Sequence, residues 1–420
     1  MIDWTAHAAE LARTIEAAIP VGDRRWLGAV ERVPRHLFVP RWYERHRTGW
    51  IALGIAQPRP YAGSDGGCAH STPPAADPAP IPMARPTADA GADAPTDPGV
   101  GEGGKGVVGA YRDLALVTAL LPDGHGGLAA VSSSTQPSLM VGMLDALDLH
   151  DHPRVLEIGT GTGYNAALMC HVLGDTAVFS VDVDPALVGT ARARLDSLGH
   201  HPVLAACDGR TGLASHAPYD RIIATCAFPT VPWAWAEQLV NGGLALVDVK
   251  VGLLAGSLVL LRRTADRLEG NFLPSWAGFM TVRDRDRPPA WQEIDPPVVP
   301  VAGETQTTLE PHPLSASLPW FLAQIGPPPV VTFRRFGPGL AGARFVAADG
   351  AWCTVDPPGA DSRRAVTWGG PRCLWDDVER SHALWRARGR PGWDRLGLTV
   401  TPDQRHTVWL DRPDAPLASW

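Results

Sequence analysis

The sequence predicts an α/β fold with a doubly wound, mostly parallel sheet, and three features of residues 131–262 carry this prediction. Short apolar runs recur, and most are followed by a segment whose apolar residues have helical spacing. Glycine turns and prolines separate the two kinds of segment. Strands that alternate with helices in this way form a parallel sheet with helices on both faces.

The predicted elements follow one another in a regular order. Residues 4–19 and 24–32 have apolar residues at helical spacing. The prolines of residues 33–40 predict extended backbone there. Pro137 suits the first turn of a further helix. The later elements are strand 155–158, helix 165–173, strand 178–182, helix 185–198, strand 203–206, strand 221–224, helix 233–239, strand 244–249 and strand 256–262.

Composition divides the chain into four parts. Residues 1–57 are predicted to be the N-terminal helical part of the core domain, and residues 107–285 its main part. Residues 58–106 are rich in Pro, Ala and Gly and poor in large apolar residues, which predicts a disordered insertion or, alternatively, a functional lid. Residues 286–420 predict an added C-terminal mixed α/β domain. Its expected elements are strands 330–334, 343–347, 352–355 and 407–410 and helix 375–388.

Charge and cysteine usage exclude several classes of partner. The net charge is −7 and no Lys/Arg run occurs, so nucleic acid is not an expected partner. The six cysteines are scattered without metal-ligand spacing, which predicts reduced thiols and no metal site. Asp3 and Glu10 interrupt the N-terminal segment, so neither a signal peptide nor a membrane span is predicted. We therefore expect a cytoplasmic monomer with no membrane partner.

Glycines and acids follow the predicted strands at the edge where open α/β sheets bind ligands. Gly159, Gly161 and Gly163 form a tight turn, and Asp182 ends the next strand, where an acid can bind ribose hydroxyls. The turn alone would also suit a pyrophosphate, but the preceding Glu157 would repel phosphate and suits a sulfonium and an ammonium group. This order predicts S-adenosylmethionine as cofactor and S-adenosylhomocysteine as product. The expected cofactor contacts are Glu157, Gly159, Thr160, Gly161, Gly163, Tyr164, Asp182, Val183, Asp208 and Gly209.

Several motifs resemble one family. Residues 33–40 (VPRHLFVP), 135–137 (TQP), 156–164 (LEIGTGTGY), 208–209 (DG) and 218–223 (PYDRII) are similar to motifs of the protein-L-isoaspartate (D-aspartate) O-methyltransferase family. The resemblance covers about residues 24–262 without the insertion. It implies a class I methyltransferase fold with a Rossmann-like seven-stranded sheet. It also implies methyl transfer to an isoaspartyl or D-aspartyl carboxylate.

The chain departs from this family in three places. Thr135 stands where the repair enzymes usually have serine, and Asp182 where glutamate is common. Both residues keep the required chemistry. The C-terminal extension is absent from minimal repair enzymes. Extended, Trp-rich members that resemble this chain occur with the maturation of ribosomally made peptides such as graspetides or lanthipeptides, in which a methylated aspartate becomes an aspartimide or isoaspartate. Residues 132–139 (SSSTQPSL) and 219–226 (YDRIIATC) are most similar to that branch.

Two segments are expected to contact the substrate: residues 134–137 at the start of a helix, and residues 225–226 after a strand. Ser134 and Thr135 precede a helix N-terminus and can donate hydrogen bonds to a carboxylate, although both could simply cap the helix. Cys226 could be a nucleophile, but a packed thiol is the simpler interpretation. A carboxylate is already ionised at neutral pH, so no general base is assigned. The other expected substrate contacts are Gln136, Pro137 and Thr225.

Three functions remain open at this point. The favoured one is a peptide-tailoring carboxyl methyltransferase whose C-terminal domain recognises a modified precursor. The second is general isoaspartate repair of damaged proteins. The third is a non-catalytic cofactor-binding scaffold in a maturation complex.

Overall fold

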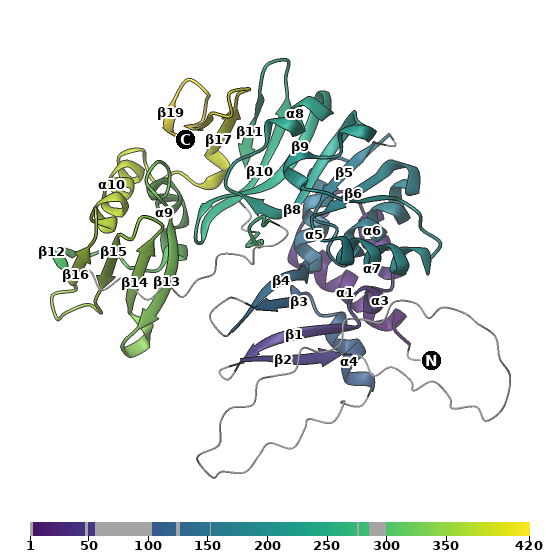
Figure 1. Ribbon diagram of the computed structural model, residues 1–420, viewed down its shortest axis with the longest axis horizontal. Coiled ribbons are helices and arrows are strands. Elements are labelled where there is room, and N and C mark those ends of the chain that lie inside the picture. Colours follow the sequence, from purple (N-terminus) through teal and green to yellow (C-terminus); the bar gives the residue numbers. More distant parts are fainter. Residues whose placement is uncertain are drawn as a thin grey trace, which may run out of the picture.

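Three sheets are formed by the residues that the structure describes, and a ten-stranded sheet is the central one (Figure 1). The structure is a computed structural model that describes residues 3–46, 49–54, 103–122, 127–151, 153–274, 277–284 and 300–420. The predicted insertion at 58–106 lies outside these residues, except that 103–106 already belong to helix α4 (Gly103–Ala110).

The large sheet has the strand order β19-β18-β17-β11-β10-β9-β8-β5-β6-β7. Strands β7, β6, β5, β8 and β9 pair in parallel, and the remaining pairs are antiparallel. Predicted strands 155–158, 178–182 and 203–206 are confirmed to the residue. The bounds are β5 (Val155–Ile158), β6 (Val178–Asp182), β7 (Val203–Ala206), β8 (Tyr219–Phe228), β9 (Leu239–Gly252), β10 (Ala255–Arg263), β11 (Leu268–Phe272), β17 (Leu396–Val400), β18 (His406–Leu410) and β19 (Pro416–Ser419).

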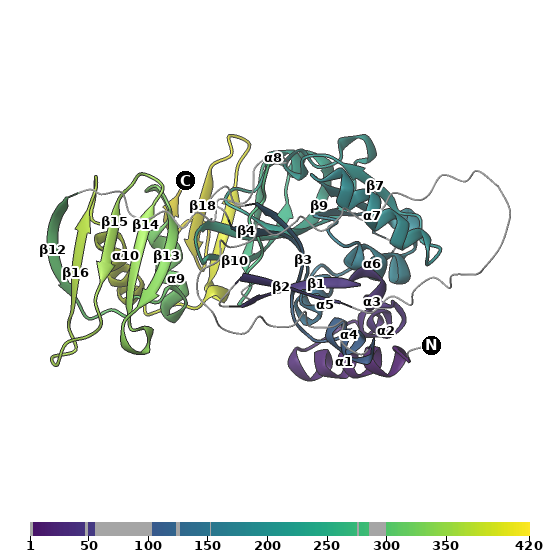
Figure 2. The same ribbon diagram turned by 60° about the horizontal axis from the view of Figure 1, so that its bottom comes forward.

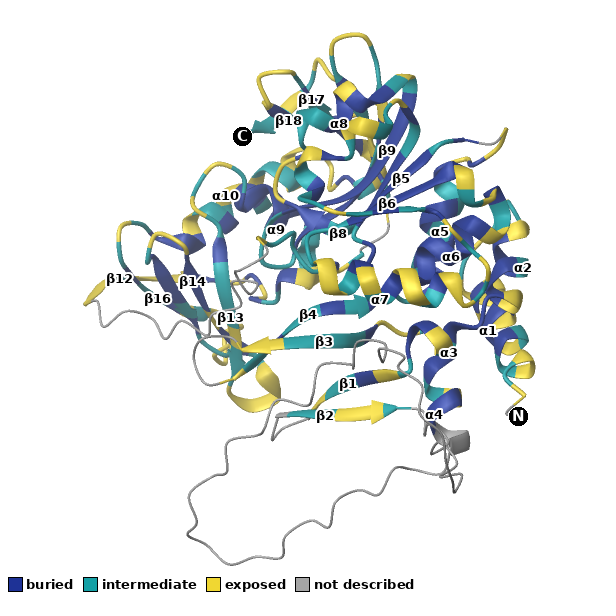
Figure 3. Cartoon of the chain, turned by 45° about the vertical axis from the view of Figure 1, so that its right-hand side comes forward, coloured by how far each residue is buried: buried dark blue, intermediate teal, exposed yellow. Residues whose placement is uncertain are grey.

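Helices cover both faces of this sheet, and its central strands are buried (Figure 3). In β5, Val155 belongs to one buried cluster, while Leu156 and Ile158 belong to the cluster on the opposite face. This alternation follows from the two-residue period of a strand. None of the described helices is long and apolar enough to cross a membrane. The helices of the core are α1 (Thr5–Ala18), α2 (Arg25–Arg32), α3 (Arg35–Phe38), α5 (Pro137–Ala146), α6 (Tyr164–Leu173), α7 (Pro185–Asp196) and α8 (Trp233–Gln238).

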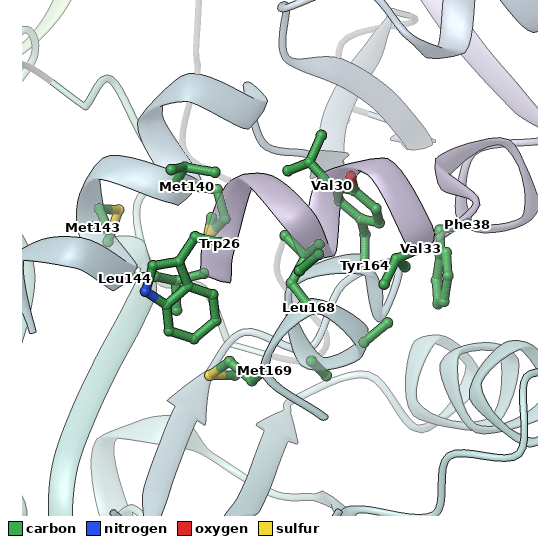
Figure 4. Packing of buried hydrophobic residues seen from close by; sticks show 14 of the residues in the cluster. Trp26, Val30, Val33, Phe38, Met140, Met143, Leu144, Tyr164, Leu168 and Met169 are labelled. Carbon is green, nitrogen blue, oxygen red and sulfur yellow. The ribbon is translucent and has the colours of Figure 1, made fainter. Parts of the chain in front are cut away.

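The N-terminal helices are part of the same core as the sheet. Figure 4 shows Trp26 and Val30 of α2 against Met140 of α5 and Leu168 of α6, with Phe38 beside Tyr164. The Phe38 and Tyr164 rings lie 5.7 Å apart between centroids. Because these side chains come from segments more than a hundred residues apart, the N-terminal segment packs as part of the core domain.

Residues 1–57 were predicted to be helical, but this region is not purely helical. It also contains strands β1 (Arg41–His46) and β2 (Gly49–Gly54), which join β3 (Leu116–Pro122) and β4 (Leu128–Ser134) in a four-stranded sheet. In β1 the charged residues Arg41, Glu44 and Arg45 interrupt any apolar alternation, which is why the strand escaped prediction.

The prolines of residues 33–40 act more locally than predicted. Val33, which precedes Pro34, has extended backbone, whereas Val39, which precedes Pro40, has a ψ of 62° outside the extended region, and residues 35–38 between them form the single turn α3. A proline restricts only the residue before it. Residues farther from each proline were therefore free to form a helical turn.

The C-terminal region does not form one separate unit from residue 286. Strands β17 to β19 extend the large sheet through the pairing of β17 with β11. Predicted strand 407–410 therefore belongs to that sheet as β18. The rest of the region forms a five-stranded sheet with two helices at one end of the molecule (Figure 2). Its elements are β12 (Val301–Thr307), α9 (Ser317–Ala323), β13 (Val330–Phe336), β14 (Gly342–Ala347), β15 (Trp352–Val355), β16 (Arg364–Gly369) and α10 (Leu374–Ala387).

A fully buried arginine holds α3 to the segment that leads into β3 and to the end of β4. The Arg35 guanidinium donates to the carbonyl oxygens of Ala110 at 2.8 Å, Arg112 at 2.7 Å, Leu114 at 3.1 Å and Thr135 at 3.2 Å. It also lies 5.7 Å from the centroid of the Tyr164 ring. Buried carbonyl groups need hydrogen-bond donors, and this one side chain supplies several.

Replacing this arginine should therefore destabilise the fold. We expect Arg35→Met to lower the free energy of unfolding by about 3 kcal/mol, because several buried carbonyl groups lose their donor. Urea denaturation followed by tryptophan fluorescence measures the change. Arg32→Met, at an exposed position of α2, is the matched control. Equal urea midpoints for the two variants would contradict this role for Arg35.

Candidate functional site

A cavity lies at the carboxyl ends of β5, β6 and β8, with about 1020 Å³ of empty space including its open mouth. Strand β5 has β6 on one side and β8 on the other. The chain adds β6 and β7 on the first side and then returns past β5 to add β8 and β9 on the second, so the strand order reverses at β5. Ligands of open α/β sheets bind at such a position. The cavity is therefore the candidate functional site.

The glycine turn after β5 forms one wall of this cavity. Gly159 has a φ of +101°, and a Cβ there would come within 2.6 Å of the Thr225 Oγ1. Thr225 Oγ1 donates to the Gly159 carbonyl at 2.7 Å, and the Gly159 N–H donates to the Val181 carbonyl at 2.8 Å. Only glycine fits this position, because any side chain would meet the neighbouring strand end.

Two predicted acids line the cavity beside the turn. Asp182 Oδ2 accepts from the Gly161 N–H at 2.9 Å, and Oδ1 accepts from the Asp184 N–H at 3.1 Å. Burial raises the pKa of Asp182. Asp208 is more exposed, and its Oδ2 lies 3.0 Å from Arg210 Nη1. A carboxylate oxygen can accept more than one hydrogen bond, so both acids keep acceptor capacity for a ligand.

Glu157 lies at the back of the cavity and is fully buried. Its Oε1 accepts from Asn165 Nδ2 at 2.8 Å and its Oε2 from Ser180 Oγ at 2.5 Å. Burial raises the pKa of Glu157 to about 7, although both hydrogen bonds act in the opposite direction. An acid that is costly to ionise without a counter-charge favours a cationic ligand beside it.

Ser134 and Thr135 line the opposite part of the cavity, at the end of β4. No side chain of the residue before α5 caps that helix. Instead, the Asp113 carboxylate accepts from the Ser138 N–H at 2.8 Å and from Gln136 Nε2 at 3.1 Å. The two hydroxyl groups are therefore not used as helix caps. Arg35 Nη2 lies 3.5 Å from Ser134 Oγ and leaves its hydroxyl hydrogen able to point elsewhere.

Cys226 also lines the cavity, beside Thr225. Burial raises the pKa of the Cys226 thiol well above its usual range, and Sγ lies 3.9 Å from the Ile158 carbonyl oxygen. A nucleophilic cysteine needs its thiolate form. The structure therefore supports the packed-thiol interpretation over the nucleophile.

Three predicted contacts are not among the lining residues, and a fourth has a second role. Gln136 is bonded to Asp113, Pro137 is buried in the first turn of α5, and Gly163 packs against α7, where a Cβ would lie 3.0 Å from Ala191 Cβ. Tyr164 lines the cavity, but its ring packs against Phe38. The remaining predicted residues in the wall are Ser134, Thr135, Glu157, Gly159, Thr160, Gly161, Asp182, Val183, Asp208, Gly209, Thr225 and Cys226.

The sequence prediction missed several lining residues, and the longest run of them lies in the segment 277–284, here called the strap. The Met280 carbonyl accepts from the Ala227 N–H at 2.8 Å, and the Val282 N–H donates to the Ala227 carbonyl at 2.7 Å. Buried Lys250 donates to the Phe279 carbonyl oxygen. Residues Met280, Thr281, Val282 and Arg283 line the cavity. The strap has no helical or alternating pattern, so no sequence signal identified it.

One cluster of possible metal-ligand side chains occurs in the described ranges, and none of its members lines the cavity. The ligand atoms of Cys170, Asp175 and His200 lie within 4.8 Å of one another. His200 Nδ1 is 2.9 Å from Asp175 Oδ1, and burial raises the pKa of the Cys170 thiol. We interpret the cluster as a hydrogen-bonded contact between α6 and the turn after α7.

Known proteins match this chain over the region that builds the cavity. A family model described as Protein-L-isoaspartate(D-aspartate) O-methyltransferase (PCMT) matches residues 110–273. The chain is 38% identical over 160 residues to the protein-L-isoaspartate O-methyltransferase of Roseiflexus castenholzii, which is 38% of this chain and 67% of that protein. It is 33% identical over 186 residues to the Thermotoga maritima protein of the same name, which is 42% of this chain and 57% of that protein.

A further relative and a solved structure agree with these matches. The protein-L-isoaspartate O-methyltransferase 2 of Pelobacter propionicus is 39% identical over 156 residues, which is 37% of this chain and 66% of that protein. The matched part thus spans between 57% and 67% of the length of these three relatives. A solved protein-L-isoaspartate O-methyltransferase has a TM-score of 0.50 at 19% identity, with 96% of this chain and 100% of that chain covered. That likeness shows the fold.

The buried acid of the cavity should make stability depend on pH. Unfolded, Glu157 ionises near its ordinary pKa of 4.5, whereas in the folded protein its pKa is about 7. The stabilising contribution of Glu157 to the free energy of unfolding is therefore fully present below pH 4.5, and it is lost as the pH rises to about 7. We expect the unfolding free energy of the wild type, relative to Glu157→Gln, to fall by about 3 kcal/mol across this window.

Urea denaturation of both ligand-free proteins at several pH values measures this difference. Other titrating groups cancel because the two proteins share them. A constant difference between the two proteins across the window would contradict the burial of an ionisable Glu157.

Proposed function

The chain belongs to the protein-L-isoaspartate O-methyltransferase family, and we propose that it transfers a methyl group from S-adenosylmethionine to an aspartyl or isoaspartyl carboxylate of a peptide or protein. One observation carries the proposal. A single cavity contains the acids Glu157 and Asp182, which come from the ten-stranded sheet, and the hydroxyl groups of Ser134 and Thr135, which lie at the end of a strand of the four-stranded sheet. The first pair suits a cationic cofactor, and the second pair suits an anionic substrate.

The residues around the glycine turn fit the proposed cofactor. The missing side chain at Gly159 leaves room for a ligand close to the backbone. Asp182 would accept from the ribose hydroxyls, and Asp208 from the adenine amino group. Glu157 would balance the positive charge of the methionine part. Bound there, the cofactor supplies an electrophilic methyl group on a sulfonium sulfur.

The opposite wall would orient the substrate. Ser134 and Thr135 would donate hydrogen bonds to one carboxylate oxygen and leave the other oxygen directed at the methyl group. A carboxylate is ionised at neutral pH, so it needs no general base. The contribution of the protein is then alignment of the reactants and exclusion of water. The strap closes part of the wall and supports the second of these tasks.

Two substrate classes fit this chemistry. Family membership supports repair of isoaspartyl residues in many proteins. The C-terminal region supports a second function, methylation of a specific peptide that then cyclises to an aspartimide, because strands β17 to β19 belong to the same sheet as the cavity. We propose that the C-terminal region, residues 286–420, takes part in substrate recognition.

A comparison of peptides tests the proposal. Purified protein is incubated with S-adenosylmethionine and matched aspartyl, isoaspartyl and precursor peptides, and mass spectrometry follows the gain of a methyl group and the later loss of methanol. We expect transfer to at least one of the three. A preference for the simple isoaspartyl peptide favours repair, and a preference for the precursor favours tailoring.

The cofactor site has its own control in the same experiment. Asp182→Ala should weaken cofactor binding by about 100-fold in calorimetry, because a charged hydrogen-bond partner is lost. Asp196→Ala, near the exposed end of α7, should bind normally. If wild-type protein takes up neither the cofactor nor its demethylated product, the proposed function is wrong.

The hydroxyl side is tested by kinetics. Ser134→Ala and Thr135→Val should each lower kcat by about 10- to 100-fold, because the carboxylate loses a donor that orients it. The KM for the cofactor should not change, since the cofactor lies against the glycine turn. Ser197→Ala, at an exposed position, is the control. An unchanged kcat in both variants rules out the orienting role.

A further inference from the structure

A second hollow, here called the groove, lies next to the cavity and has about 760 Å³ of empty space including open solvent. Thr281 and Val282 of the strap line both hollows. The end of β8 also runs from one to the other, because Thr225 and Cys226 line the cavity and Phe228 lines the groove. The groove residues are Arg210, Phe228, Pro229, Thr230, Pro232, Trp233, Ala234, Thr281, Val282 and Gln404.

The C-terminal strands contribute Gln404 to the groove and are hydrogen-bonded to the loop after β8 that forms part of its lining. The Val231 N–H donates to His406 Nε2 at 2.8 Å, and Trp420 Nε1 donates to the Pro229 carbonyl at 3.0 Å. The His406 and Trp420 rings stack with centroids 5.0 Å apart. His406 Nδ1 lies 2.8 Å from the Gln404 carbonyl oxygen, so the same ring holds the turn that carries Gln404.

His406 connects the loop after β8 to the turn between β17 and β18. Because Nε2 accepts from a backbone N–H, the ring proton lies on Nδ1 and is donated to Gln404. His406 is fully buried and uses both nitrogens to join the loop after β8 to the turn between β17 and β18. The groove is therefore a rigid feature formed jointly by the methyltransferase core and its C-terminal strands.

The chemistry of the groove suits a peptide with apolar side chains. Aromatic, proline and aliphatic residues form most of its lining, and Thr230, Thr281 and Gln404 add polar groups. Arg210 at its edge is already paired with Asp208 at 3.0 Å and Asp284 at 2.9 Å, so it offers little unpaired charge to an acidic ligand. Aromatic-lined hollows of this kind bind extended peptides through apolar anchors.

We infer that the groove binds an apolar side chain of the substrate peptide close to the residue that is methylated. The inference rests on the proposed function and adds a recognition subsite to it. The position of the groove supports this occupant. The groove shares the wall residues Thr281 and Val282 with the cavity, and a peptide spans only about 3.3 Å per residue, so the residues next to the methylated one must lie just beyond the cavity wall.

Steady-state kinetics with two peptides test the inference. Both carry the methyl-accepting residue identified in the peptide comparison; one has leucine and phenylalanine at the flanking positions, and the other has glycine there. For the wild type we expect a KM about 10-fold lower for the apolar peptide, as burial of one apolar side chain allows. Gln404→Trp fills the groove and Trp233→Ala removes part of its wall, so the ratio of the two KM values should fall to about one in each.

Gln306→Trp places the same new side chain on exposed strand β12 and should keep the wild-type ratio. Thermal unfolding identifies a variant that has lost its fold, and Gln404→Trp and Trp233→Ala alter opposite sides of the groove. A wild-type ratio of one, or a ratio that persists in both folded groove variants, overturns the inference while methyl transfer itself remains. Absence of methyl transfer to either peptide instead overturns the proposed function, and the subsite with it.

Discussion

The site depends on the way three strand ends are tied around one glycine turn. Thr225 at the end of β8 donates to the carbonyl of Gly159, and Asp182 at the end of β6 accepts from the N–H of Gly161. These bonds fix a left-handed backbone that would otherwise be costly to hold in one conformation. The same two side chains face the cavity. The side chains that hold the glycine turn in place can thus also contact a ligand. The residues that stabilise the fold here are the same as those that form the binding site.

Local sequence patterns predicted the parallel core well and its edges poorly. Strands β5, β6 and β7 were predicted to the residue because each is a short, mostly apolar run bounded by turn signals. Strands β17 to β19 were not assigned to this sheet, because the pairing of Leu268 with Val400 joins residues far apart in the chain. Charged β1 gave no alternation at all. Pairing partners are set by tertiary packing, which no local window contains.

The prediction of the site was limited in the same way. Acids and glycines at strand ends were found because their order along the chain matches their order around the cavity. Gly163 was assigned to the cofactor with its neighbours, yet it is glycine because α7 approaches closely at Ala191. The strap was missed because its pairing with Ala227 runs through backbone groups. A backbone contact leaves no signature in residue type.

The charged groups around the cavity agree with the proposed positions of the cofactor and the substrate. Glu157 and Asp182 are buried on the side of the glycine turn, and burial raises the pKa of both. On the other side, Arg35 is buried behind Ser134, and its hydrogen bonds go to four carbonyl oxygens and one hydroxyl group. Acidic groups therefore lie where a sulfonium would bind, with Arg283 of the strap paired to Asp184 at 3.5 Å beside them, and a buried guanidinium lies behind the hydroxyl groups that would bind a carboxylate. The positive charge of the sulfonium and the negative charge of the carboxylate neutralise as the methyl group is transferred. A partly desolvated cavity therefore favours the transfer, and its polarity directs each reactant to its own part of the cavity.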